Sequence, residues 1–429
     1  MPSRAATAPA RCLAAVRSGR SAVLYAKGDE DLKRMIQHDR HVPLRSMAWD
    51  ESVVVSAIDE IVSDALTHFH PEVFWPSHPL DGRKDDGHSS LYMGAAGMIW
   101  GLDYLRRVGA TRAAVDFRPV LQRLLEKTQA EMSGYGDYAE LGSLLFGDLG
   151  TALVVMRLAP DPSIADLIHA RCESDTHLPV REIMWGMPGA MVACIHMAEL
   201  TDEPRWASLF AVQAARLLAD LEDTANGPLW TQDLYDRQLR YLGPVHGFAG
   251  NMIPLIRGWR WLDEAQRRRT ADVATRALAV NAWRSHEGIT WHPVAGRENP
   301  PHLCQYCHGA PGMVATFADA PFASPELEEL LVKGGDFTWA AGPLVKGSNL
   351  CHGTGGNGYA FLKLHQRTGD PLWLERARAF AMTAIAQCRD VREQTGRGRY
   401  TLWTGDVGLA IYLWDCLTAD PHFPSVDVF

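Results

Sequence analysis

The chain has 429 residues, a formal net charge of −9 at pH 7 and a pI near 6.0. This acidic balance excludes nucleic acid as the main partner, because phosphate binding needs a basic surface. No apolar run reaches the roughly 20 residues that a membrane-spanning helix requires, so we expect no membrane span. The sequence has no secretory signal, so we expect a cytoplasmic protein whose eight cysteines are reduced.

Residues 1–45 are predicted to form an N-terminal arm, partly disordered, and residues 46–429 a single domain. The first 28 residues hold five basic residues and no acidic one, which favours a basic arm over a transit peptide. The chain exceeds the roughly 250–300 residues of a single core, yet no Pro/Gly/Ser linker divides it. A closed ring of repeats reconciles one domain with this length.

A four-residue frame, Gly-x-x-Gly, occurs seven times, at intervals of 39 to 62 residues. The frames are Gly94/Gly97, Gly147/Gly150, Gly186/Gly189, Gly247/Gly250, Gly309/Gly312, Gly353/Gly356 and Gly405/Gly408. Such intervals indicate one supersecondary unit stacked on the next, and we number the units one to seven by their frames. A run that is apolar on nearly every side follows each frame and predicts a buried helix, as in TALVVMRL after Gly150.

Amphipathic runs follow the buried ones, for example from Arg118, Arg205 and Leu372. Each unit is therefore a buried helix followed by a half-exposed one. Seven such helical hairpins that close into a ring predict an all-α fold, a double-layered ring with two concentric layers of helices.

The frame glycines need a structural reason, because Gly within a helix costs about 0.5–1 kcal/mol relative to Ala. We expect the first glycine to adopt a turn conformation closed to other residues, and the second to admit a neighbouring backbone. All seven buried helices then begin at one rim, and the residue before each frame points into the central opening. In chain order that position holds Met93, Phe146, Trp185, His246, His308, His352 and Thr404.

Two of the frames are preceded by Cys-His, at Cys307-His308 and at Cys351-His352. Two thiolates from Cys307 and Cys351 with the His352 imidazole make the three-ligand set of a catalytic zinc site, whose fourth position stays open. The run from Cys304 to His308 also has the Cys-x-x-Cys-His form of a c-type haem attachment site. That alternative leaves Cys351-His352 unexplained, so one Zn²⁺ is the predicted cofactor.

An open zinc position predicts activation of a substrate thiol as a nucleophile. If the thiolate adds to an unsaturated acceptor, the resulting enolate needs a proton, and His246 is the predicted catalytic donor. Glu182 is either a second acid/base group or a carboxylate favoured by a helix start. His308 is either a substrate-binding residue or a core histidine.

The motifs GPVHGFAG at 243–250, CHGAPG at 307–312 and LCHGTGGNGYAFL at 350–362 resemble those of the lanthionine synthetase C-like family. The resemblance covers residues 89–417 and implies an α/α toroid, zinc held by Cys307, Cys351 and His352, and a catalytic His246. Cyclases of this family add a peptide cysteine across dehydroalanine or dehydrobutyrine to form a thioether. A dehydroamino-acid-containing peptide or protein and a dehydratase are the partners that the resemblance implies.

Other positions resemble the LanC-like branch, which joins glutathione to dehydroamino acids in damaged proteins. Lys346 lies five residues before Cys351, where that branch keeps a lysine associated with glutathione binding, and Glu182 lies at its acidic position. Ser143 and Leu303 stand where cyclases carry an aspartate and an arginine. The thiol is thus a peptide cysteine or glutathione.

Two other classes of function stay open. One is an adaptor that binds zinc and glutathione without turnover. The other is a toroidal glycan-processing enzyme with carboxylates in the opening, which the His and Cys residues in the matched positions disfavour. We expect the connections 223–242 and 284–303, with Trp230, Trp283 and Trp291, to wall a peptide groove.

Overall fold

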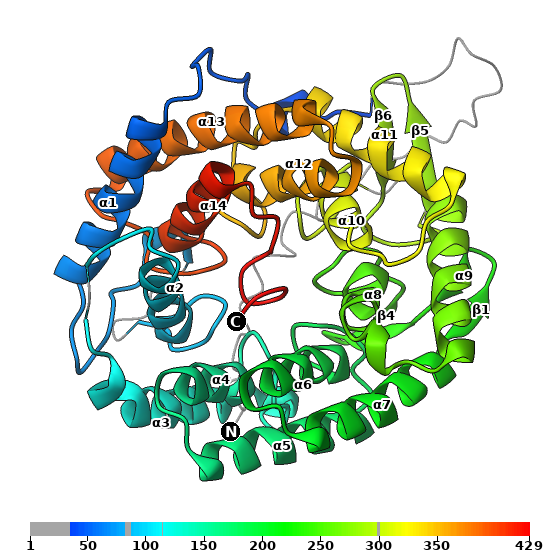
Figure 1. Ribbon diagram of the computed structural model, residues 1–429, viewed down its shortest axis with the longest axis horizontal. Coiled ribbons are helices and arrows are strands. Elements are labelled where there is room, and N and C mark those ends of the chain that lie inside the picture. The colour runs from blue at the N-terminus through cyan, green and yellow to red at the C-terminus, as the bar shows by residue number, and fades with distance from the viewer. Residues whose placement is uncertain (1–34, 82–86, 114, 298–300) are drawn as a thin grey trace, which may run out of the picture.

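The computed structural model describes residues 35–81, 87–113, 115–297 and 301–429, and its helices form two concentric rings (Figure 1). The inner helices are α2 (Ala95–Arg107), α4 (Asp148–Leu158), α6 (Met187–Thr201), α8 (Phe248–Arg257), α10 (Ala310–Phe317), α12 (Thr354–Thr368) and α14 (Asp406–Thr418). The outer helices are α1 (Glu51–Thr67), α3 (Leu121–Met132), α5 (Pro162–His177), α7 (Pro204–Ala219), α9 (Glu264–Asn281), α11 (Pro325–Ala341) and α13 (Pro371–Thr395). The predicted all-α, double-layered ring is confirmed.

The seventh pair of an inner and an outer helix, α14 and α1, joins two distant parts of the sequence. Helix α14 packs against α1, which precedes all seven frames, and this contact closes the ring (Figure 1). On α1, the apolar residues Val54, Ile58 and Ile61 recur at helical spacing and are buried. One amphipathic helix near the start of the described chain therefore completes the outer layer.

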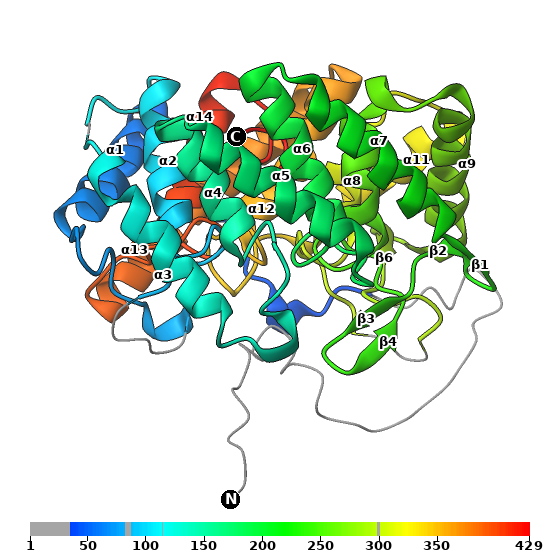
Figure 2. The same cartoon turned by 90° about the horizontal axis from the view of Figure 1, so that it is seen from below.

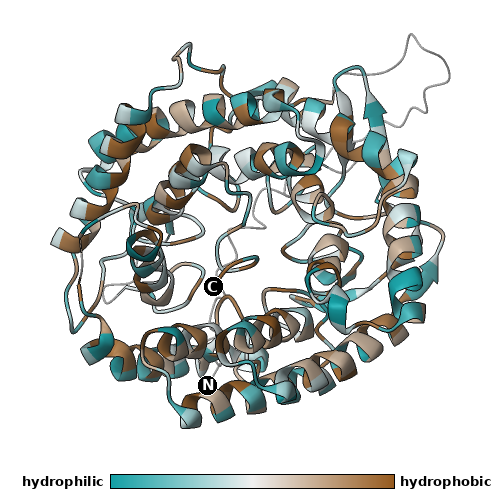
Figure 3. Ribbon diagram, viewed as in Figure 1, coloured by the Kyte–Doolittle hydropathy of each residue, from teal (hydrophilic) through white to brown (hydrophobic). Residues whose placement is uncertain are grey.

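The two layers differ in hydropathy, as Figure 3 shows. Residues 187–197 of α6 are buried without exception, as expected of an inner helix covered on all sides. Outer helices bury one face and begin with ordinary capping signals: the side chains of Asp161, Ser324 and Asp370 accept backbone N–H groups, and a proline follows each.

The frame glycines permit close contact between a loop and the helix it precedes. A Cβ at Gly356 would lie 1.7 Å from the Leu350 carbonyl oxygen, and the second glycine of every other frame meets a carbonyl within 2.4 Å. The close approach expected at the second glycine is confirmed. The expectation that the first glycine adopts a turn conformation closed to other residues is wrong in six frames, because φ of that glycine lies between −94° and −147°. Only Gly309 has a positive φ, of 117°, and the other first glycines are explained by crowding: a Cβ at Gly147 would lie 2.0 Å from the Gly142 carbonyl oxygen.

These loops also replace the side-chain caps of the inner helices. The first N–H groups of an α-helix have no acceptor within the helix. At the start of α2, the N–H groups of Ala95 and Ala96 donate to the carbonyl oxygens of His88 and Ser89, both at 2.9 Å. The loop before α12 repeats this arrangement. Each loop is thereby fixed against its own helix, and the residues before the frames gather at one rim.

Three short antiparallel hairpins, which the sequence did not predict, lie in the connections of units three to five. They pair β1 (Glu222–Thr224) with β2 (Gly227–Leu229), β3 (Gln232–Leu234) with β4 (Arg237–Leu239), and β5 (Ala282–Ser285) with β6 (Gly288–Trp291). Figure 2 shows β3 and β4 projecting from the ring. Trp230 and Trp291 are buried and donate to carbonyls at the ends of α7 and α9, so the expectation that they wall a groove is wrong, and only Trp283 is exposed.

Short 3-10 helices are η3 (His38–Arg40), η4 (Pro79–Asp81), η5 (Arg118–Val120), η6 (Gly136–Tyr138) and η7 (Trp259–Trp261).

Most of the predicted arm, residues 1–34, lies outside the described residues. Its described end pairs with the loop before α12, where the N–H of Val42 donates to the Pro343 carbonyl and that of Val345 to the Arg40 carbonyl. Among the described helices, none is long and apolar enough to cross a membrane.

Candidate metal and acid–base site

Six of the seven loops at the rim are joined by backbone hydrogen bonds between matching positions. The N–H of the residue two positions before a frame donates to the carbonyl of the same position in the next unit, a pattern that we call the loop belt. The belt starts at Cys307, and each N–H donates to the carbonyl oxygen of the next residue in the order Cys307, Cys351, Trp403, Tyr92, Leu145 and Met184. The five N···O distances are, in that order, 3.0, 2.9, 3.1, 2.8 and 3.3 Å. Within the described residues, Val245 of unit four forms no such bond with either neighbour. The belt is thus continuous through six loops and open at the loop that carries His246.

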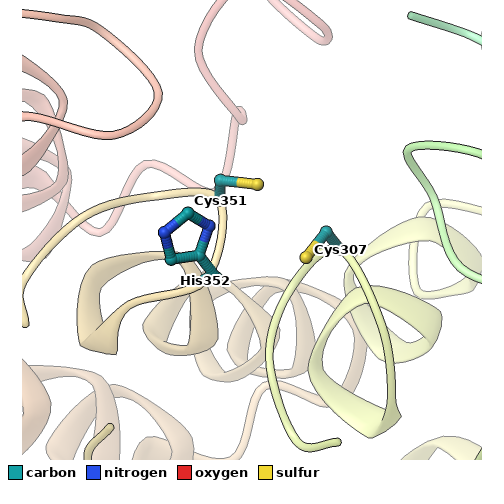
Figure 4. Close-up of side chains that lie close together, drawn as sticks. All are labelled: Cys307, Cys351 and His352. Atoms are coloured by element: carbon teal, nitrogen blue, oxygen red, sulfur yellow. The ribbon is translucent and has the colours of Figure 1, made fainter. Parts of the chain in front are cut away.

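Three of the predicted residues come together at adjacent links of this belt. The ligand atoms of Cys307, Cys351 and His352 all lie within 4.8 Å of one another. Figure 4 shows Cys307 on the loop before α10, and Cys351 and His352 on the loop before α12. Both thiols are buried and the imidazole is half-buried.

Neighbouring polar side chains hold these three residues in place. The Gln305 amide donates to the Cys307 sulfur at 3.0 Å, and the Asn349 amide oxygen accepts the His352 N–H at 3.0 Å. A hydrogen bond with Cys307 and burial raise the pKa of the Cys351 thiol well above its usual range. Two buried thiols that share a proton are stabilised when a cation takes the place of that proton.

The donor set fits a zinc ion. Zinc–sulfur bonds of about 2.3 Å and a zinc–nitrogen bond of about 2.0 Å place tetrahedral ligand atoms roughly 3.5 Å apart. The three ligand atoms here lie within 4.8 Å of one another, so small movements of the side chains would bring them to bonding distance of one ion. Cys304, the other cysteine of the haem-like motif, lies outside this group, and burial raises its pKa to about 12. The four other cysteines in the described part of the chain are buried and free, as expected of core residues, whereas Cys12 lies outside the described residues.

His246 and Glu182 form a second pair beside the opening in the belt. His246 Nδ1 lies 2.9 Å from Glu182 Oε2, and the carboxylate is fully buried while the imidazole is partly exposed. A proton on Nδ1 that bridges to the carboxylate leaves Nε2 free to exchange a proton with a substrate. The hydrogen bond thus lets Glu182 orient the His246 ring, an arrangement that fits an acid–base pair.

Glu182 also occupies the gap in the belt. Its Oε2 accepts the N–H of Met184 at 3.2 Å, the group that a continuous belt would direct to Val245. Its Oε1 accepts the N–H of Trp185. One carboxylate therefore replaces a loop-to-loop bond and holds the histidine of the next unit.

The position of Glu182, four residues before the frame, has the same structural role in other units. There the side chain accepts the N–H three residues on, as Ser90 does for Met93 and Ser143 for Phe146. Ser143 Oγ also donates to the Met184 carbonyl at 2.7 Å. Ser143 thus keeps a loop-fixing role at the position where the resembling cyclases carry an aspartate. Gln305 and Asn349 occupy this same position in units five and six, a register that would have identified them from the sequence.

The two predicted substrate-binding residues lie differently. The ring of His308 is 6.5 Å from that of His246, and burial, with smaller contributions from His246 and Lys346, lowers the pKa of His308 to about 3. Its Nδ1 is buried and has no hydrogen-bond partner among the residues that the structure describes. Lys346 is exposed. A neutral, unpartnered His308 offers a polar group to a ligand, and Lys346 offers a positive charge.

Aromatic residues that sequence reasoning missed stand next to His246. The ring of Tyr235, between β3 and β4, is 6.1 Å from that of His246, and its hydroxyl accepts the Trp185 indole N–H at 2.9 Å. Trp185 in turn stacks on Phe146 at 5.0 Å. The residues before the frames of units two and three therefore form an apolar wall beside the acid–base pair.

Comparison with known proteins assigns the family. The model of the family described as "Lanthionine synthetase C-like protein" matches residues 85–428. The chain is 37% identical to LanC-like protein GCL1 of Arabidopsis thaliana over 137 residues, 29% of this chain and 30% of that protein. It is 35% identical to Glutathione S-transferase LANCL1 of Danio rerio over 129 residues, 29% of this chain and 32% of that protein. These alignments span about a third of each relative.

Among solved structures, nisin cyclase has a similar fold, with a TM-score of 0.57 and 14% sequence identity over 86% of this chain and 98% of the cyclase. At this identity the likeness concerns the fold alone. The family model covers most of the chain, including every frame and both Cys-His pairs. The chain belongs to the lanthionine synthetase C-like protein family.

Proposed function

We propose that this protein is a zinc-dependent enzyme that adds a thiol to a dehydroalanine or dehydrobutyrine residue and so forms a thioether. The observation that carries the proposal is the convergence of Cys307, Cys351 and His352 on one point. These residues would hold one Zn²⁺ with a position open to the substrate. Bound zinc lowers the pKa of a coordinating thiol, so that the thiol reacts as a thiolate at neutral pH.

The chain's own residues supply the proton transfer. His246 Nε2 takes up the proton that the thiol loses as it becomes a thiolate. Addition of the sulfur to the β-carbon of the acceptor then places an electron pair on the α-carbon and its amide, and the His246 imidazolium returns the proton to the α-carbon to complete the product. Glu182 keeps the Nδ1 proton in place and stabilises the charged imidazolium before it donates. Proton transfer by a positioned histidine contributes about 10²–10⁴-fold to a rate.

Two thiols are candidates for the nucleophile, a peptide cysteine and glutathione. A peptide cysteine would make the protein a cyclase, which acts after a dehydratase. We favour glutathione, because its carboxylates suit the exposed Lys346, and because one relative bears the name Glutathione S-transferase LANCL1. The proposed place of action is the cytoplasm, where thiols stay reduced.

The test offers a dehydroalanine peptide, with and without glutathione, to the wild type and to Cys351→Ala, and identifies products by mass. We expect a glutathione adduct with the wild type and none with the variant. A peptide closed by a thioether between its own cysteine and dehydroalanine, formed without added glutathione, would identify a cyclase instead. A zinc-loaded wild type that forms neither product would refute the enzyme and leave the alternative, a zinc- and glutathione-binding adaptor.

A further inference from the structure

Residues 421–429, which we call the central segment, lie inside the inner ring of helices (Figure 1). Phe423, Val426 and Phe429 are each no more than 6% exposed. The N–H of Phe423 donates to Asp427 Oδ2 at 2.8 Å, and the N–H of Asp427 donates to the Phe423 carbonyl at 2.9 Å. These bonds fold the segment into a compact turn, and its apolar side chains fill the middle of the toroid.

Charged groups anchor the turn to the inner helices of units four to six. Lys363 of α12 is 1% exposed and forms ion pairs with Asp427 and with Asp319, just beyond α10. The guanidinium of Arg257, at the end of α8, donates to the Val426 carbonyl. A buried charge is tolerated only with such partners, so the central segment has one fixed position relative to these helices.

From that position the central segment contacts both thiol-bearing loops. The ring of Phe423 stacks on that of Tyr306, with centroids 4.1 Å apart and planes at 15°, and Tyr306 directly precedes Cys307. Ser425 Oγ accepts the indole N–H of Trp403 at 3.1 Å. The carbonyl of Trp403 accepts the N–H of Cys351 at 2.9 Å. The central segment therefore contacts Tyr306, the residue before Cys307, and Trp403, the residue whose carbonyl accepts the Cys351 N–H.

We propose that the central segment is a positioning element for the metal site, in which Phe423 and Ser425 set the spacing of the Cys307 and Cys351 thiols. The inference rests on the zinc site of the proposed function. A metal site needs its ligands held to a fraction of an ångström, and the loops here depend on backbone contacts instead of helix geometry. Substitution of outer residues that orient ligands costs about 10–100-fold in metal affinity.

The experiment compares two substitutions within the central segment, Phe423→Ala and Phe429→Ala. Both remove a buried ring, but the ring contacts of Phe429 within the described residues are with Trp100 of α2 and His196 of α6, whereas Phe423 stacks on Tyr306 beside Cys307. We expect the zinc Kd, measured by competition with a chelator, to rise about 10–100-fold in Phe423→Ala and to stay at the wild-type value in Phe429→Ala. The cobalt-substituted protein should show altered thiolate-to-metal absorption in the first variant alone, and Phe423→Leu should be intermediate.

Each result bears on the inference. Equal zinc affinity and equal cobalt spectra in the wild type and Phe423→Ala would overturn it, as would equal losses in both alanine variants, which indicate a general loss of stability. If Phe423→Ala does not fold, Ser425→Ala decides, and unchanged zinc affinity and cobalt absorption there overturn the inference. A wild type that binds no zinc refutes the proposed function itself, whereas normal zinc binding with an inert Phe423 refutes only the positioning role.

Discussion

The metal side of the rim, in units five and six, differs from the acid–base side, in units three and four, in how its loops are held. On the metal side the loop belt is continuous, and both cysteines are links in it. On the acid–base side the belt is open at Val245, and the buried carboxylate of Glu182 takes the place of the missing bond. Metal ligands thus receive fixed backbone positions, whereas the histidine is held through its side chain.

This difference follows from the two kinds of chemistry. A metal ion requires three donor atoms at set distances. The backbone hydrogen bonds from Cys307 to Cys351 and from Cys351 to Trp403 help to fix the two loops that carry them. A proton donor needs a defined tautomer and reach toward the substrate, and one carboxylate contact supplies the tautomer. We therefore expect substitutions on the two sides to separate zinc binding from turnover.

The largest expected effect is the loss of a metal ligand. Cys307→Ala should abolish stoichiometric zinc binding and all detectable thioether formation, because two remaining ligands hold zinc poorly. Cys304→Ala is the matched control, since this buried cysteine lies three residues away but outside the ligand group. Metal analysis of the purified proteins checks both, and full zinc retention in Cys307→Ala would refute the ligand assignment.

Removal of the Glu182 charge should act on turnover only. Glu182→Gln keeps an oxygen for the backbone N–H groups but no longer stabilises a charged His246, so we expect kcat to fall about 10–100-fold while zinc content stays at one. Ser143→Ala is the control at the same position of unit two. If kcat fell equally in both variants, Glu182 would have only the loop-fixing role that Ser143 has.

The frame glycines allow a finer separation. In Gly356→Ala the new Cβ would press on the Leu350 carbonyl, next to Cys351, and in Gly250→Ala on the Pro244 carbonyl, two residues from His246. We expect each to lower the free energy of unfolding by about 1–3 kcal/mol. Gly356→Ala should weaken zinc binding, and Gly250→Ala should lower kcat with zinc retained; the reverse pattern in chelator competition and rate assays would contradict the comparison.

The sequence was sufficient to predict both layers of helices and the metal group, because the frames repeat in one register and the Cys-His pairs occupy it twice. The pairing of α14 with α1 lay outside that register, since α1 has no frame. The position four residues before each frame marks Glu182, Gln305 and Asn349 in the sequence. Its residue types differ from unit to unit, so the pattern alone does not show which hydrogen bonds these side chains form. The contact of Phe423 with Tyr306 joins residues 117 apart in sequence, and no local pattern predicts such a contact.

The smallest expected effect is a pH dependence of the free energy of unfolding. Burial, reinforced by His302, lowers the pKa of His292 to about 3. Between about pH 6.5, the ordinary value, and pH 3, the unfolded chain binds a proton that folded His292 does not. Stability is therefore lost as the pH falls through this window, by at most about 1.4 kcal/mol per pH unit. Denaturant unfolding of His292→Gln should show a shallower decline than the wild type, and identical slopes would contradict this account.

Two histidines in matching positions give the most direct test of the division between the sides. His246→Asn and His308→Asn are each assayed for bound zinc and for thioether formed on a dehydroalanine peptide with glutathione. We predict one zinc in both, a fall in kcat of about 10²–10⁴-fold in His246→Asn, and a kcat for His308→Asn near that of the wild type. Wild-type turnover in zinc-loaded His246→Asn would contradict the assignment of proton transfer to the acid–base side.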